Sequence, residues 1–64
     1  MSKLQGKVRG DKEWSDVDTA YPQAELTAIL EKMRSHGFKV VETDALWRIV
    51  NPLTKNVECE YRLW

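Results

Sequence analysis

The chain has 64 residues, and its ten basic and ten acidic side chains cancel to a formal net charge of zero at pH 7. A chain this short has room for one domain and buries only about 60% of the surface that its unfolded form exposes. Because the charges balance, the field of the whole molecule does not draw it to nucleic acid or to anionic lipid. No apolar run approaches the roughly 20 residues that span a bilayer, so we expect no membrane association.

Cys59 is the only cysteine, so an internal disulfide is excluded. The sequence also lacks a Cys/His cluster with metal-ligand spacing, and we expect neither a metal nor another cofactor. A lone cysteine in a chain that begins without a signal-peptide pattern is typical of a reducing, cytoplasmic setting.

Residues 1–12 are polar and basic, and they favour a flexible tail ahead of a single domain over residues 13–64. Lys3, Lys7, Arg9 and Lys12 outnumber Asp11, and glycines interrupt the stretch. Two interpretations remain: a solvated flexible terminus, which is the usual state of charge blocks near chain ends, or an arm that binds RNA or phosphate. The following segment EWSDVDT, with Trp14 and Val17, is compatible with a short edge strand, although aspartates are poor strand formers.

An amphipathic helix is predicted from about Pro22 to His36. Proline suits the first helical position, where its missing N–H costs nothing. Apolar residues recur at the spacing i, i+3, i+4 and i+7, which places them on one stripe. The stripe consists of Leu26, Ile29, Leu30 and Met33.

The end of this helix is marked by Gly37, which can adopt the left-handed conformation just past the last turn. Phe38 then folds back on Met33 in a Schellman closure. Lys32, Arg34 and His36 complement the negative end of the helix dipole.

After Gly37 the apolar period changes to two, which predicts strands over residues 38–43, 46–50 and 57–63. Asp44 and Ala45 form the first turn, and NPLTKN supplies the chemistry of the second. A second loop of three or five residues keeps side chains of like polarity on one face. The predicted fold class is therefore α+β, with one amphipathic helix on a three-stranded antiparallel meander and, as a further element, a short N-terminal strand.

Alternation assigns different roles to the two faces of the predicted sheet. The face that packs on the helix carries Phe38, Val40, Trp47, Ile49, Val57, Cys59, Tyr61 and Leu63. The other face carries four apolar residues, Val41, Leu46, Val50 and Trp64, within a polar rim of Arg48, Glu58, Glu60 and Arg62. Water alone does not favour so apolar a face, so we expect the N-terminal segment, a second copy or another protein to cover part of it.

No nucleotide-binding, metalloprotease or hydrolase motif is present. His36 is explained as a helix cap and Cys59 as core filler. Glu58 and Glu60 are spaced as paired carboxylates, but Arg48 and Arg62 are close enough to neutralise them. The sequence therefore predicts no enzyme activity.

The segment ILEKMRSHGFKVVE, a helix that ends in Gly-Phe and leads into a strand, resembles the opening of the HicA-type toxins, which have double-stranded-RNA-binding-like folds and cleave RNA. The resemblance covers Ile29 to about Val50 and implies an α-β-β-β core. That family carries a histidine on its second strand and has a closing helix, whereas LWRIV has no histidine and nothing after Val57 resembles a helix. No catalytic residue is carried over.

The function predicted from these features is a non-catalytic binding or regulatory module that acts through protein–protein interaction or self-association. The binding residues are the apolar set and its rim, because aromatic and arginine residues dominate binding energy at interfaces. The alternative is a nucleic-acid-binding accessory protein with a HicA-like core. It would use Lys3, Lys7, Arg9, Lys12, Lys39, Arg48 and Arg62.

Overall fold

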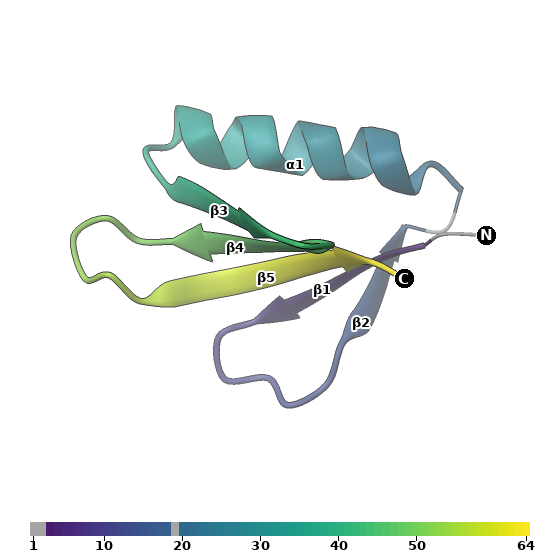
Figure 1. Cartoon of the computed structure of the whole chain (residues 1–64), viewed down its shortest axis with the longest axis horizontal. Coiled ribbons are helices and arrows are strands. Elements are labelled where there is room, and N and C mark those ends of the chain that lie inside the picture. Colours follow the sequence, from purple (N-terminus) through teal and green to yellow (C-terminus); the bar gives the residue numbers. More distant parts are fainter. Residues whose placement is uncertain (1–2, 19) are drawn as a thin grey trace.

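One helix lies across one face of a five-stranded antiparallel sheet in the computed structural model (Figure 1). Residues 3–18 and 20–64 are described. The elements in chain order are β1 (Leu4–Val8), β2 (Ser15–Asp18), α1 (Pro22–Ser35), β3 (Lys39–Thr43), β4 (Leu46–Val50) and β5 (Val57–Leu63).

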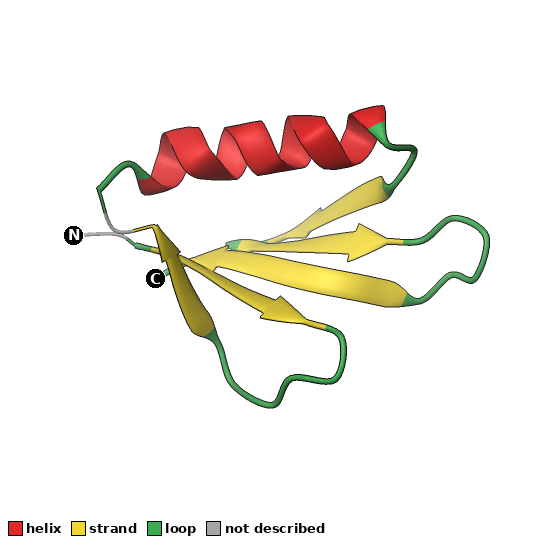
Figure 2. Cartoon of the chain, turned by 180° about the vertical axis from the view of Figure 1, so that it is seen from behind, coloured by secondary structure: helices red, strands yellow, loops and turns green. Residues whose placement is uncertain are grey.

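The strand order in the sheet is β2-β1-β5-β4-β3. The last three strands form the expected meander, and the small α+β class is confirmed, but the sheet is wider than predicted. The first two strands extend it on the far side of β5, so α1 carries the chain from one edge of the sheet over to the other (Figure 2).

The prediction of a flexible tail over residues 1–12 is wrong for Leu4–Val8, which lies inside the sheet as β1. Leu4 pairs with Leu63 of β5 and its side chain is fully buried. The segment was not predicted as a strand because Gln5, Gly6 and Lys7 are not typical strand residues. Pairing with β5, at the other end of the chain, stabilises the segment. Residues 1–2 of that predicted tail lie outside the described residues.

The edge strand expected in EWSDVDT is present as β2, which pairs antiparallel with β1 at one edge of the sheet. The register of the β1–β2 pairing shifts between Leu4 and Gln5 of β1, so this ladder contains a bulge or irregularity. Thr19, the last residue of the motif, lies outside the described residues.

The helix begins at Pro22, as expected, and ends at Ser35, one residue earlier than predicted, with His36 as its cap residue. Gly37 has a φ of +89°, and its N–H donates to the Arg34 carbonyl (3.0 Å). The N–H of Phe38 donates to the Met33 carbonyl (3.0 Å). These two bonds make up the predicted Schellman closure.

Side chains from the helix and from three strands form the core. The buried apolar residues are Leu4, Leu26, Leu30, Ile49 and Cys59. Around them pack the half-buried residues Ile29, Met33, Phe38, Val40, Trp47, Tyr61 and Leu63. The predicted helix stripe is therefore confirmed as a packed surface, and so is the predicted inner face of the meander except for Val57, which is 37% exposed.

The register of the last hairpin decides which side chains share a face. Ile49 pairs with Cys59 and Arg48 pairs with Glu60, as expected, but the connection between the two strands has six residues rather than three or five. A shift between Ile49 and Val50 then sets Val50 opposite Val57, which leaves residues 51–56 between the strands. Val57 was expected on the helix-packed face, but the irregularity takes up one residue of β5, so Val57 lies opposite Val50 of the other face and is 37% exposed.

Candidate binding surface

The sheet face opposite α1 carries an aromatic and cationic cluster, and we call this face the open face. The Arg62 guanidinium carbon lies 4.3 Å from the ring centroid of Trp14 and 4.2 Å from that of Trp64. The Lys7 ammonium lies 5.3 Å from the Trp14 centroid. Cations over indole faces at these separations are attracted by the ring quadrupole. Arg62 is thus held between two tryptophans that belong to opposite ends of the sequence.

Gln5 of β1, which pairs with Arg62 of β5, holds the Arg62 side chain in place. Its side chain is only 9% exposed, and its Oε1 accepts a hydrogen bond from Arg62 Nε (2.9 Å). Gln5 Nε2 donates in turn to Asp16 Oδ1 (2.9 Å), which also lies 3.5 Å from Lys3 Nζ. The Gln5 hydrogen bond, and after it the charge of Lys3, lower the pKa of Asp16. This chain of contacts ties β2, β1 and β5 together on the open face.

Two further ion pairs lie along the same face. Arg48 Nε is 3.2 Å from Glu60 Oε2, and Arg9 Nη1 is 3.4 Å from Glu58 Oε1. Arg62 was expected to help neutralise the two glutamates, but it binds Gln5 instead, and Arg9 of the β1 end takes the place opposite Glu58. The described residues contain no group of three or more ligands suited to a metal ion.

A hollow of about 460 Å³ lies beside the cluster. Trp14, Arg62 and Trp64 line one side of it, and the β3–β4 turn with Leu46 and Arg48 lines the other. Trp64 is 66% exposed, so a large apolar ring borders the hollow in contact with solvent. The hollow offers apolar walls with guanidinium groups at its margin.

The predicted partner-binding residues divide into two groups. Leu46, Arg48, Arg62 and Trp64 meet at the hollow, whereas the other four lie farther along the open face. Those four are Val41, Val50, Glu58 and Glu60. Trp14 was not among the predicted binding residues, although the N-terminal segment that contains it was a candidate cover for this face.

The residues of the nucleic-acid alternative are not gathered into one patch. Lys3, Arg9 and Arg48 each lie in an ion pair with a carboxylate, and Lys7 and Arg62 lie over Trp14. Lys12 is exposed between β1 and β2, and Lys39 is exposed at the start of β3.

Neither candidate reactive residue lies at the hollow. His36 is exposed at the end of α1, beside the 51–53 loop. Cys59 is buried, and desolvation raises the pKa of its thiol, which lowers the thiolate fraction at neutral pH. Desolvation also raises the pKa of the neighbouring Tyr61 to about 12.

The fold and this surface define a small α+β domain whose single helix covers one sheet face while the other presents a Trp-Arg-Trp stack. No family model, curated protein or solved structure matches the chain. The resemblance to HicA-type toxins therefore gains no support from these comparisons. Within the described ranges, no helix is long and apolar enough to cross a membrane.

Proposed function

We propose that this chain is a non-catalytic binding or regulatory module that recognises another protein through the hollow on its open face. The observation that carries the proposal is the Trp14–Arg62–Trp64 stack at the rim of that hollow. Tryptophan and arginine are the residue types most enriched among the dominant contacts of protein interfaces. Because these side chains already contact one another in the unbound chain, binding would order them at a lower cost in side-chain entropy.

The hydrogen-bonding pattern of Arg62 favours a partner with a carboxylate. Both tryptophan rings lie against its guanidinium group, and Gln5 accepts a hydrogen bond from its Nε. Among the described residues no acceptor is bound to its terminal nitrogens. An acidic side chain that enters the hollow would reach this edge, and its apolar neighbours would contact Leu46 and Trp64.

Nucleic acid is the second candidate, because Trp14 joins Trp64 on the open face. The exposed Trp64 and the half-buried Trp14, with Lys7 and Arg62 over their rings, would offer a platform for stacking unpaired bases. The ion pairs of Arg9 and Arg48 weigh against it, since each cation already has a carboxylate partner.

The test is affinity capture from a cell extract with the wild-type chain and the variants Trp64→Ala and Val50→Asp as baits, before and after nuclease treatment. Leu53→Ala is the matched control, because Leu53 is 90% exposed on the 51–56 loop. We expect a protein to be retained by the wild type and Leu53→Ala, to be lost with Trp64→Ala, and to survive nuclease. Purified partner and chain should then bind directly, with the same ranking of variants. Equal capture by all baits would refute the proposal.

The nucleic-acid alternative is tested by titrating single-stranded RNA while recording tryptophan fluorescence. It requires an affinity that falls steeply with added salt and weakens in Lys7→Ala and Lys39→Ala. Deletion of the first twelve residues is not a clean test, because it removes β1 from the sheet. The proposal assumes a cytoplasmic setting, in which a free buried Cys59 stays reduced.

A further inference from the structure

The two edges of the sheet differ in their ability to accept another strand. The strand β2 has four residues, two of them aspartates, and its ladder to β1 is irregular. The strand β3 pairs with β4 in unbroken register over all five residues, and its sequence KVVET is rich in β-branched side chains. Short, irregular and acidic edges resist strand addition, whereas long regular edges invite it. The β3 edge is therefore the receptive one.

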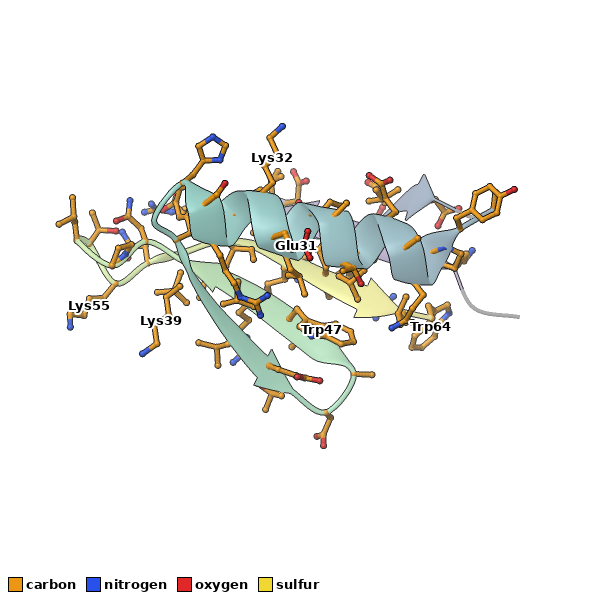
Figure 3. The ribbon with its side chains drawn as sticks, turned by 90° about the horizontal axis from the view of Figure 1, so that it is seen from above. Glu31, Lys32, Lys39, Trp47, Lys55 and Trp64 are labelled. Atoms are coloured by element: carbon orange, nitrogen blue, oxygen red, sulfur yellow. The ribbon has the colours of Figure 1, made fainter. Side chains whose placement is uncertain are left out.

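We propose that β3 pairs antiparallel with β3 of a second copy of this chain, which joins two five-stranded sheets into one continuous sheet. The proposal concerns the sheet edge and does not rest on the function proposed for the open face. Figure 3 shows the space available: seen from the helix side, the β3–β4 hairpin extends beyond α1, and Lys39 points outward at its start.

The side chains of β3 select one register for this pairing. A two-fold axis perpendicular to the sheet keeps each face continuous, so open-face residues pair only with open-face residues. Centring the pairing on Val41 sets Val41 against its own copy, Lys39 against Thr43, and Val40 against Glu42. Each strand residue then has a partner, and no like charges lie opposite each other.

The neighbouring registers are less favourable. A pairing centred on Glu42 places two carboxylates directly opposite each other, which destabilises a sheet. A pairing centred on Val40 sets Glu42 against Phe38, which lies outside the strand. The pairing centred on Val41 is thus the one that uses the full strand without repulsion.

The helix side of the seam carries charges of both signs. A hollow of about 290 Å³ between α1 and the sheet is lined by Glu31, Arg34 and Glu42. In the Val41 register, Glu42 of the second copy lies across from Val40, so no two carboxylates of the paired strands lie opposite each other. Because the whole chain has no net charge, two copies do not repel each other at long range.

The experiment measures the mass in solution by sedimentation equilibrium across a concentration series, with Val41→Glu, Val41→Lys and their equimolar mixture beside the wild type. The wild-type mass should rise from that of the 7.5 kDa monomer to twice that value as concentration increases. Each variant alone should dissociate at least tenfold more readily, because like charges meet across the axis. The mixture should recover the dimer, because glutamate then faces lysine.

Val57→Glu is the matched control, because Val57 has the same 37% exposure as Val41 but lies on β5, away from this edge. It should leave the dimer unchanged. Amide exchange provides a second readout on the unmodified chain: backbone amides of β3 should become protected as concentration rises. A wild-type mass that stays monomeric, a dimer that survives Val41→Glu, or a mixture that does not recover it would overturn the proposal.

Discussion

Arg62 and Trp14 are stacked on the open face, with the guanidinium carbon 4.3 Å from the indole centroid. Trp14 precedes the edge strand β2, and Arg62 belongs to the last strand, β5. The contact forms only when β1 has paired with both neighbours and brought the two ends of the chain onto one face. The stack is thus a product of long-range strand pairing.

We expect Trp14→Ala to lower the free energy of unfolding by about 1 kcal/mol, because it removes one of the two rings that enclose Arg62. The effect should shrink when Arg62 is already methionine, with a coupling energy of about 0.5 to 1 kcal/mol between the two positions. Urea denaturation of both single variants and the double variant measures this coupling. Strictly additive losses would show that the stack contributes nothing beyond packing.

Two side chains approach β1 closely at Gly6. A β-carbon at this position would lie 3.0 Å from Tyr61 Cε1 and 3.1 Å from Val17 Cγ2. We therefore expect Gly6→Val to destabilise the chain by about 1 to 3 kcal/mol through overpacking. Ser15→Val, at the exposed position that pairs with Gly6, is the control and should change stability little. Equal urea midpoints for the two variants would contradict this explanation.

Gly37 allows the Schellman closure because its φ is +89°. A side chain in the left-handed region costs roughly 1 to 2 kcal/mol, so Gly37→Ala should lower stability by about that amount. Gly37→Asn should cost less, since asparagine tolerates this region better than alanine does. Thermal unfolding of the three proteins gives the ranking, and an equal loss in both variants would argue against a backbone origin.

Tyr61 should make stability depend on pH in the alkaline range. Desolvation raises the pKa of Tyr61 in the folded chain to about 12, against 10.0 for an ordinary tyrosine. Between these values the unfolded chain releases the proton more readily, so it holds fewer protons than the folded chain and stability falls as pH rises. The contribution of Tyr61 is fully present below pH 10 and is lost toward pH 12.

The check is urea denaturation of the wild type and Tyr61→Phe at intervals from pH 9 to 12. The wild type should lose stability relative to Tyr61→Phe as the pH passes 10, because phenylalanine has no proton to release. A constant difference between the two proteins across this range would rule out the linkage.

The helix and the three strands that follow it could be predicted from the sequence. The stripe of Leu26 and Leu30 identified the helix, and Gly37 and Phe38 marked its end. Alternation through the last two strands assigned the faces correctly except at Val57, where the register shifts. Each of these predictions depends on residues only a few positions apart, because helical and strand periodicity can be recognised within a short stretch of sequence. The register that sets Arg48 opposite Glu60 followed from polarity matching across the loop.

The candidate site was predictable only in part. Leu46, Arg48, Arg62 and Trp64 were assigned to one face, and they do meet at the hollow. Gln5 was missed because residues 1–12 were interpreted as a tail, and Trp14 was assigned to an edge strand without being counted among the binding residues. The sequence did contain one indication of the strand β1. Leu4 and Val8 lie an even number of positions apart, which places them on one face of an extended segment.

The sequence by itself determined the helix, its Schellman end, the three-stranded meander and the identity of its two faces, because these depend on short-range periodicity and turn chemistry. Only the tertiary structure decided that Leu4–Val8 lies between β2 and β5, and that Trp14 reaches Arg62. The position of this strand and the contact of Trp14 with Arg62 both depend on pairing between strands that are far apart in the sequence. The stability of such a pairing comes from burying Leu4 against Leu63 and the core, which no local window of sequence contains.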